Sequence, residues 1–456
     1  MEGENLPKPF LSTLSDAAEE VVRHEYVRVL THYDADGLAS AGIIANALRR
    51  RGISFHLSFS KTLDPEMINK VGKRAECLLL ADMGSSFIPH LEKLEAKVVV
   101  LDHHVTTSLS NKVIHVNPHL FGIDGMTSAC AAAVCMMFAL AVDQKNWDLL
   151  PIAFAGMVGD RQHIRGMSGV NRYLLEGGLS RKILELRRGS LVPEGKLADS
   201  LADGYEPYII GVTGSVQGAM ALLREAGLAE DASWAQLNDA ERRKLSSLIA
   251  LRLLSQGCST SAMEELITDR YYFPSWGTTA DDLAQLLNAC GRTDQEGVGV
   301  AMALGDVGAR KVAESLRNEY RMAVIEGMRK VVEGGIRKMD SLQWFESPNP
   351  SLSGVLCGLT MQFLGDCTRP TVALSFHGEK TRVSSRATYK LLEKGIDLSV
   401  AMSKAAAAVG GLGGGHAIAS GATIPRGREE EFLTNLDEII KEQKRSKMVE
   451  QRPSAP

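Results

Sequence analysis

Residues 26–37 read YVRVLTHYDADG, a strand-length run rich in Val and Leu that ends in a histidine, two aspartates and a glycine. Two further apolar runs are followed at once by an acidic residue: Cys77–Ala81 by Asp82, and Lys97–Leu101 by Asp102. The segments between the three runs carry helical patterns, namely Leu38–Arg51 and Pro65–Arg74. Strands that alternate with helices predict a βαβαβ order and a parallel sheet.

Side chains that could bind metal ions follow these strands. In a parallel α/β sheet the carboxyl ends of the strands meet at one edge, and ligand sites form just beyond them. Five carboxylates and three histidines packed there would repel one another and resist desolvation unless cations lay among them. The candidates are His32, Asp34, Asp36, Asp82, Asp102, His103, His104 and Asp160. The sequence therefore predicts a site for two metal ions.

The types of ligand favour Mn²⁺, with Mg²⁺ as an alternative. Oxygen ligands with a minority of imidazoles suit these ions, whereas a structural zinc usually recruits thiolates. Each element taken alone also has an ordinary structural interpretation. The segment Asp34–Gly37 is typical of a turn, and either His103 or His104 could be a hydrogen-bonded core or surface histidine. The four elements in order favour a functional site.

The ordered motifs resemble those of the DHH phosphoesterase superfamily. The N-terminal motifs are His32-x-Asp34-x-Asp36-Gly37, Asp82-x-Gly84, Asp102-His103-His104 and Gly156-x-x-x-Asp160. Downstream, Val383–Arg386 and Gly413–Ala422 resemble the substrate-binding motifs of the DHH-associated C-terminal domain. The segment Leu286–Arg292 is similar to one in RecJ-type exonucleases specific for single strands, particularly the archaeal type. The resemblance covers about residues 25 to 425.

The resemblance implies a role for each motif residue. One metal ion would be held by His32, Asp34 and Asp82, and the other by Asp36, Asp82, His103 and Asp160, with Asp82 as the bridge. His104 matches the residue that contacts the scissile phosphate, and Asp102 would orient a histidine from behind it. The residues expected to bind substrate are Ser384, Ser385, Arg386, Gly413, Gly414, Gly415 and His416.

The glycine-rich run Gly410–Gly415 also has a physical interpretation of its own. Glycines let the backbone approach an anion closely and point successive N–H groups at it, and His416 and Arg386 would add charge-assisted contacts. Alone, such a run is a flexible loop in most proteins. Together with Ser384–Arg386 it could hold a terminal phosphate or the nucleotides next to the cleavage site.

The resemblance implies a hydrolase: a metal-dependent exonuclease on single-stranded nucleic acid, DNA first and RNA also, in DNA replication or repair. One alternative is a phosphodiesterase that acts on short oligoribonucleotides or cyclic dinucleotides. Another is a replication component that binds the GINS complex with little or no catalysis, and GINS binding could also coexist with catalysis. A manganese inorganic pyrophosphatase is disfavoured, because those relatives have a different spacing in the first motif and a different C-terminal domain.

Composition agrees with a multi-domain enzyme. The 456 residues are too many for one ordinary core and indicate two or three domains. With 45% hydrophobic and 23% charged residues, the chain is typical of globular proteins. The net charge of -4 disfavours a basic surface that binds duplexes indiscriminately, so contact with nucleic acid should be focused in a cleft.

The cysteines and the N-terminal residues predict a cytoplasmic protein without membrane contact. The seven cysteines include no CxxC pair and several lie in apolar runs, which indicates buried thiols in a reducing compartment. The first ten residues lack the apolar segment of a secretory signal. The apolar run Ala129–Val142 is shorter than the ~20 residues needed to cross a bilayer.

We expect an α/β fold with five regions. They are a Rossmann-like, parallel-sheet DHH domain (20–190), a mainly helical middle region (191–305), a connecting helix (306–339), a smaller α/β DHH-associated domain (340–427) and a charged C-terminal helix and tail (428–456). The end of the chain from 441 should be a frayed helix and a tail.

Several local expectations complete the picture. Val113–Val116 should be a strand, and Thr127 and Ser128 should cap the apolar helix that follows. Strand-like runs in the C-terminal domain are Gly354–Leu359 and Thr371–Phe376. The aromatic group Tyr271, Tyr272, Phe273 and Trp276 could stack bases or pack in a core. The helix Ala309–Val332 has basic residues that could face a bound strand or solvent, namely Arg310, Lys311, Arg317, Arg321, Arg329 and Lys330.

Overall fold

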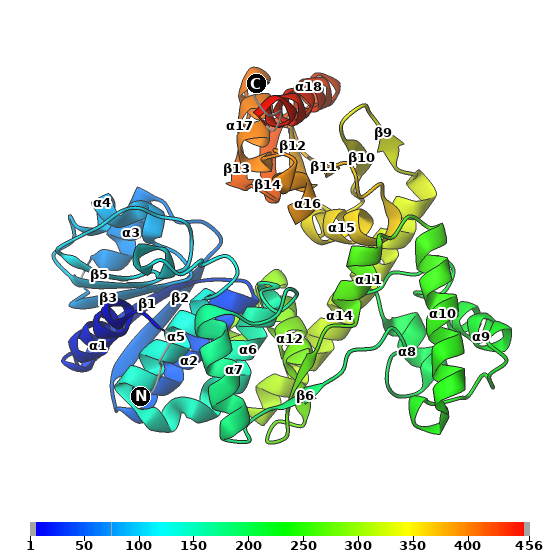
Figure 1. Cartoon of the computed structure of the whole chain (residues 1–456). Coiled ribbons are helices and arrows are strands. Elements are labelled where there is room, and N and C mark those ends of the chain that lie inside the picture. The colour runs from blue at the N-terminus through cyan, green and yellow to red at the C-terminus, as the bar shows by residue number, and fades with distance from the viewer. Residues whose placement is uncertain (1–5, 74, 451–456) are drawn as a thin grey trace, which may run out of the picture. The chain divides into compact units, whose positions relative to one another are not determined.

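The computed structural model describes residues 6–73 and 75–450, and it divides into two compact units (Figure 1). Unit 1 comprises the described residues up to Arg188 together with Thr268–Tyr320, and unit 2 comprises Gly189–Ile267 and the described residues from Arg321 onward. One boundary falls inside the interval 191–305, where we expected a single helical region. A second falls inside helix α14 (Val307–Gly334), and the third follows Arg188.

Unit 1 is built on a parallel sheet of five strands in the order β2-β1-β3-β4-β5. Its strands are β1 (Tyr26–His32), β2 (Ser54–Ser60), β3 (Cys77–Ala81), β4 (Lys97–Leu101) and β5 (Val113–Val116). The expected parallel α/β fold is therefore confirmed. Strands β3, β4 and β5 coincide with the predicted runs, whereas β1 extends as far as His32 and β2 was not expected.

Helices cover both faces of this sheet, as Figure 1 shows. Helices α3 (Pro65–Gly72) and α4 (Ile88–Leu91) pack on one face, against residues such as Leu80 and Val100. The helices that pack on the other face include α1 (Lys8–Val22), α2 (Ala35–Arg50) and α5 (Ala131–Val142). Burial on both faces explains why the central strands are continuous apolar runs rather than alternating ones.

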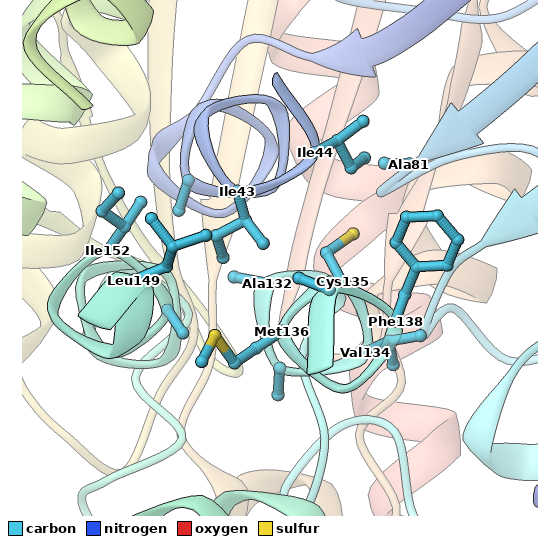
Figure 2. Close-up of a cluster of buried hydrophobic side chains, with 14 of the residues drawn as sticks. Ile43, Ile44, Ala81, Ala132, Val134, Cys135, Met136, Phe138, Leu149 and Ile152 are labelled. Atoms are coloured by element: carbon cyan, nitrogen blue, oxygen red, sulfur yellow. The ribbon is translucent and has the colours of Figure 1, made fainter. Parts of the chain in front are cut away.

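Helix α2 packs closely on α5 and α6 (Leu150–Gly159), as Figure 2 shows. Ile43 of α2, Met136 of α5 and Ile152 of α6 lie in one buried cluster. The remaining elements of unit 1 are α7 (Gly169–Ser180), β6 (Glu185–Arg187), β7 (Arg270–Phe273), β8 (Thr278–Thr279), α12 (Ala280–Arg292) and α13 (Glu296–Ala303). Among the described residues, no helix is long and apolar enough to span a membrane.

The aromatic group on β7 serves packing. Tyr271 and Phe273 are buried, and the rings of both contact Phe154 of α6, with centroids 4.9 and 5.7 Å away. Tyr272 is covered by the guanidinium of Arg187, whose carbon lies 3.3 Å from the ring centroid. Of the two expectations for this group, the structure favours core packing.

Unit 2 contains a mixed sheet of six strands in the order β13-β14-β12-β11-β10-β9. Its strands are β9 (Arg337–Lys338), β10 (Gln343–Glu346), β11 (Thr371–His377), β12 (Lys380–Arg386), β13 (Leu412–His416) and β14 (Ala419–Pro425). Its helices besides α14 are α8 (Leu197–Asp203), α9 (Val216–Glu225), α10 (Asp239–Ser255), α11 (Thr260–Leu266), α15 (Ser353–Leu359), α16 (Tyr389–Glu393), α17 (Leu398–Ala408) and α18 (Glu429–Glu450).

The strand predicted at Gly354–Leu359 is wrong, because these residues form helix α15. Leu352, Leu356, Leu359 and Thr360 are buried, whereas Val355 is half-buried, which is a helical rather than an alternating pattern. A short apolar run fits a buried helix as well as a strand, so its composition misled the assignment. The strand predicted at Thr371–Phe376 is confirmed as β11.

The C-terminal segment forms a longer helix than expected. Helix α18 packs Phe432, Leu436 and Ile440 into the core of unit 2, so the helix is anchored through residue 440. The predicted tail falls partly on 451–456, which lie outside the described residues.

The basic residues of α14 are mostly engaged in ion pairs within their own unit. Five of the six form such pairs: Arg310 with Glu314, Arg317 with Asp282, Arg321 with Asp203, and both Arg329 and Lys330 with Glu326. These pairs favour the interpretation of a solvated, ion-paired helix face over that of a nucleic-acid contact.

All seven cysteines are free thiols, as expected. Six are buried and Cys367 is half-buried. Burial raises the pKa of the Cys77 thiol to about 12, which keeps it protonated and unreactive.

Candidate metal centre

The first motif forms the turn from strand β1 into helix α2. His32 is the last residue of β1, and Asp34 is the N-cap of α2, where its side chain accepts from the backbone N–H of Gly37 at 3.1 Å. A Cβ atom at Gly37 would lie 2.3 Å from the carbonyl oxygen of His32, so only glycine fits there. The motif is therefore a helix cap that points polar groups at the carboxyl edge of the sheet.

Asp82 and Asp102 follow the next two strands, β3 and β4. Asp82 has a φ of +57°, a left-handed conformation that costs a non-glycine residue about 1–2 kcal/mol. Its backbone N–H donates to the carbonyl oxygen of Leu101 at 3.0 Å, which holds it in this conformation. Strain of this kind clusters at functional sites, because the surrounding structure must enforce it.

The eight predicted residues meet at this edge. Three groups have ligand atoms within 4.8 Å of one another: His32 with Asp34 and Asp82, Asp36 with His103 and Asp160, and Asp82 with His103 and His104. Asp82 faces both sides, because its Oδ2 lies 3.5 Å from His32 Nδ1 and its Oδ1 lies 3.4 Å from His103 Nε2. This placement suits a carboxylate shared between two cations.

Asp36 lies deepest in the site and also caps helix α5. Its Oδ2 accepts from Ala131 N at 2.8 Å and its Oδ1 from Ala132 N at 2.9 Å. The predicted cap by Thr127 and Ser128 is therefore wrong: the helix begins at Ala131, and the carboxylate that caps it comes from 95 residues earlier in the chain. Long-range caps of this kind leave no local pattern in the sequence.

Charge crowding shows that this pocket fits cations. Burial, reinforced by Asp160 and Asp82, raises the pKa of Asp36 well above its usual range. Burial also raises the pKa of Asp160 to about 6. For His32, burial lowers the pKa, but Asp34 and Asp82 outweigh it and raise the pKa to about 11. These buried carboxylates resist ionisation, and imidazoles surround them. Divalent cations bound by this set of donors would stabilise the ionised carboxylates.

His103 is oriented by a chain of buried side chains that the sequence did not indicate. Its Nδ1 lies 2.9 Å from the carbonyl oxygen of Gly125, which can only accept, so Nδ1 carries the ring hydrogen and Nε2 faces the carboxylates. Gln162 donates to the same carbonyl oxygen at 2.9 Å, and Asn171 donates to Gln162 at 2.7 Å. Such support fixes the tautomer of a metal-binding histidine.

Asp102 orients His104, as the resemblance implied. Asp102 Oδ1 and His104 Nδ1 lie 2.7 Å apart, so the ring donates to the carboxylate and Nε2 lies on the opposite side of the ring. Burial acts to raise the pKa of Asp102, but His104 and the surrounding hydrogen bonds hold it well below its usual range. Asp102 is therefore an ionised orienting group, and His104 is half-buried.

A cationic flank that the sequence did not predict lies beside the first motif. Arg292 Nη1 donates to the Tyr33 hydroxyl at 3.3 Å, and the Lys61 ammonium lies 5.3 Å from the centroid of the same ring. Asn288 Oδ1 accepts from Ala35 N at 3.2 Å. The RecJ-like segment at the end of α12 therefore packs on the turn from β1 into α2.

The predicted substrate-binding residues lie in the sheet of unit 2. Ser384–Arg386 end strand β12, whereas Gly413–His416 belong to β13, and both strands pair with β14. Ser385 is buried and donates to the Ser420 carbonyl oxygen at 3.0 Å, while Arg386 Nη1 donates to the Ser385 carbonyl oxygen at 2.9 Å.

Most of the glycine run lies in the edge strand β13 (Leu412–His416) rather than in a flexible loop. A Cβ atom at Gly413 would lie 2.5 Å from the Met402 carbonyl oxygen, and Gly415 has a φ of +139°. Packing on α17 and backbone geometry therefore explain these two glycines. Nothing in the structure crowds a Cβ atom at Gly414.

Two family descriptions match this chain. The description "DHH family, N-terminal domain" matches residues 26–158, and "DHHA1 domain" matches residues 353–442. The uncharacterized protein MJ0831 of Methanocaldococcus jannaschii is 30% identical over 438 residues, which cover 94% of this chain and 96% of that protein.

Solved structures share the fold at low identity. RecJ of Thermus thermophilus in complex with Mn²⁺ has a TM-score of 0.59 at 18% identity, over 96% of this chain and 55% of that one. Exonuclease RecJ bound to manganese has a TM-score of 0.55 at 17% identity, over 95% of each chain. CDC45 from Entamoeba histolytica has a TM-score of 0.64 at 11% identity, over 94% of this chain and 97% of that one. The chain thus spans about half the length of the Thermus RecJ.

The fold and the comparisons together show that the chain has a DHH-family phosphoesterase fold. It belongs to the DHH superfamily and its fold is similar to that of RecJ, which confirms the resemblance found in the motifs.

Proposed function

We propose that this chain is a metal-dependent exonuclease that hydrolyses phosphodiester bonds in single-stranded nucleic acid, DNA first and RNA also, during DNA replication or repair. The observation that carries the proposal is the position of Asp82, whose two oxygens face two ligand sets in a RecJ-like chain. RecJ structures with bound Mn²⁺ and Mg²⁺ support the choice of cation, with Mn²⁺ first.

The motifs imply how the ligand residues would divide between two cations. His32, Asp34 and Asp82 would hold one cation, and Asp36, Asp82, His103 and Asp160 would hold the other. Bound there, the cations would supply a water of lowered pKa and stabilise charge that develops on the phosphate. Gly125 and Asp102 fix the ring orientations of His103 and His104, so both histidines are preorganised.

Side chains around the ligands would hold the strand. His104, with Nδ1 bound to Asp102, would present Nε2 to an oxygen of the scissile phosphate. Arg292 places positive charge beside the first motif, where a neighbouring phosphate of the strand would be attracted, whereas the Lys61 ammonium is paired with Asp294 at 2.6 Å. Ser384–Arg386 and Gly413–His416 of unit 2 would bind nucleotides of the strand.

A replication component is the second candidate function, because the TM-score with CDC45 of Entamoeba histolytica is 0.64. Binding to the GINS complex or to other replication proteins would then be part of the role, with or without hydrolysis. Retention of every expected ligand residue favours catalysis over a purely structural role.

A time course on end-labelled oligonucleotides tests the proposal. Single-stranded DNA and RNA, each labelled separately at either end, are incubated with the full chain and Mn²⁺, and EDTA serves as the control. We expect loss of the single strand and little attack on the same sequence as a blunt duplex, because opening each base-pair step costs about 1.4 kcal/mol. Hydrolysis confined to fragments of two to four nucleotides would favour the short-substrate alternative, and no hydrolysis would favour the replication component.

A further inference from the structure

A buried polar cluster lies behind Asp102 and His104, outside the ligand sets. Its members are Ser85, which follows β3, His115 of β5, and Asn117, which follows β5. Each side chain is at most 6% exposed. We call these three residues the positioning network. None belongs to the motifs that the sequence analysis singled out.

The donor and the acceptor of each hydrogen bond in the positioning network can be assigned consistently. His115 Nδ1 lies 3.2 Å from the Ser108 carbonyl oxygen, which can only accept, so Nδ1 carries the hydrogen. Burial lowers the pKa of His115, so the ring is neutral near pH 7 and its Nε2 accepts. The Ser85 hydroxyl, 2.9 Å from Nε2, therefore donates its one hydrogen to His115. Ser85 Oγ is left to accept from Asn117 Nδ2 at 2.8 Å.

With these donors and acceptors, the network holds both the backbone and the ring of His104. Asn117 Nδ2 also donates to the backbone carbonyl oxygen of His104 at 2.9 Å. The backbone N–H of Ser85 donates to Asp102 Oδ2 at 2.9 Å, and the other oxygen of Asp102 holds the His104 ring. The backbone and the ring of His104 are thus both tied to Ser85. A buried network with its polar groups satisfied in this way specifies one arrangement.

We propose that the positioning network sets the place of His104 against the scissile phosphate. This inference rests on the proposed function, because it assigns the network to the same hydrolysis. The network does not touch the substrate. It acts through His104, so its loss should slow the chemical step and leave substrate binding and metal binding largely intact.

Kinetics on the full chain with Mn²⁺ and single-stranded DNA test the role. Asn117→Ala should lower kcat about 10- to 100-fold with KM changed less than about twofold. The matched control is Asn46→Ala, because Asn46 is equally buried and donates to the carbonyl oxygens of Gly42 and Ala303 at 2.9 and 3.0 Å. That control should lose stability and keep kcat. An equal loss of kcat in both variants would overturn the positioning role.

A double variant separates positioning from general structural support. If Asn117 acts through His104, then the variant with both His104→Ala and Asn117→Ala should be no slower than His104→Ala, within about twofold. Losses that multiply would show that Asn117 acts by another route. His115→Gln, which retains an acceptor for Ser85, should keep more activity than His115→Leu.

A spectroscopic measurement does not depend on turnover. In protein labelled with ¹⁵N at histidine, without metal, His115 should appear as the neutral tautomer protonated at Nδ1, and Ser85→Ala should shift its Nε2 resonance. A ring protonated at Nε2 would contradict the network itself. The expected tautomer in a chain that hydrolyses no phosphodiester would instead refute the proposed function and, with it, the catalytic role of the network.

Discussion

The metal centre of unit 1 and the glycine strand of unit 2 were both predicted from motif residues, yet they differ in what explains them. In unit 1, burial, reinforced by neighbouring carboxylates, raises the pKa values of Asp36 and Asp160, and a cation would relieve that cost. In unit 2, packing and backbone geometry account for Gly413 and Gly415 without a ligand. A motif indicates a ligand most strongly when the arrangement of its side chains costs free energy in the absence of that ligand.

The largest expected effect belongs to Asp82. Asp82→Asn should abolish hydrolysis, with a loss of at least about 10³-fold, because it removes the charge between the two ligand sets. Asparagine tolerates the left-handed φ of +57°, so the fold should be retained. The measurement is the hydrolysis rate together with a thermal melt of the same sample. A folded variant that keeps a tenth of the wild-type rate would show that hydrolysis does not depend on the charge of Asp82. The contrast between the two units would then lose its basis.

His104 should show the next largest effect. His104→Ala should lower kcat about 10²-fold with little change in KM, because the side chain acts on the phosphate and not on the rest of the strand. Asp102→Asn should follow the same pattern more weakly, since it loosens the ring that Asp102 holds at 2.7 Å. Steady-state kinetics with excess Mn²⁺ measure both. A rise in KM alone would make His104 a binding residue.

Arg386 tests whether unit 2 binds the substrate. Arg386→Ala should raise KM about 10-fold and leave kcat and the Mn²⁺ dependence nearly unchanged, because the guanidinium would contact phosphate away from the metal ions. Arg382→Ala, on the same strand and exposed, is the matched control and should leave KM unchanged. If both variants have the same kinetics as the wild type, strand β12 supports the fold and does not bind the substrate.

The smallest expected effect concerns the glycines of β13. It distinguishes glycines that are needed for packing from glycines that approach the substrate. Gly413→Ala should destabilise the protein by about 1–3 kcal/mol, because its Cβ would lie 2.5 Å from the Met402 carbonyl oxygen. Gly414→Ala introduces no such contact and should leave the unfolding midpoint nearly unchanged. Urea denaturation and KM are measured for each. A higher KM for Gly414→Ala alone would show that the backbone approaches the substrate there.

The sequence predicted the fold best where burial is complete. Strand β3 is apolar throughout, β4 is apolar after its exposed first residue Lys97, and both were placed to the residue, whereas β2 is half-exposed and reads SFHLSFS, a weaker pattern. Helix α15 was taken for a strand, because a short apolar run does not reveal its period. Local composition was thus sufficient for the strands buried on both faces and for the edge strand β5, and insufficient for the half-exposed edge strand β2 and the short helix α15.

In the candidate site, too, the sequence predicted some features and missed others. The sequence predicted that its candidate ligands would lie together, because each follows a strand or an apolar helix, so their positions follow from topology. Their supporting residues were not predicted, because Gln162 and Asn117 act through contacts that only the folded chain creates. The cap of α5 by Asp36 likewise joins residues 95 positions apart.

The central claim is that Asp82 joins two cation sites in unit 1. Anomalous diffraction at the manganese edge, from crystals of the full chain grown with Mn²⁺, tests it directly. We expect two peaks, one among His32, Asp34 and Asp82 and the other among Asp36, Asp82, His103 and Asp160. A single peak away from Asp82, or no peak at millimolar Mn²⁺, would contradict the account.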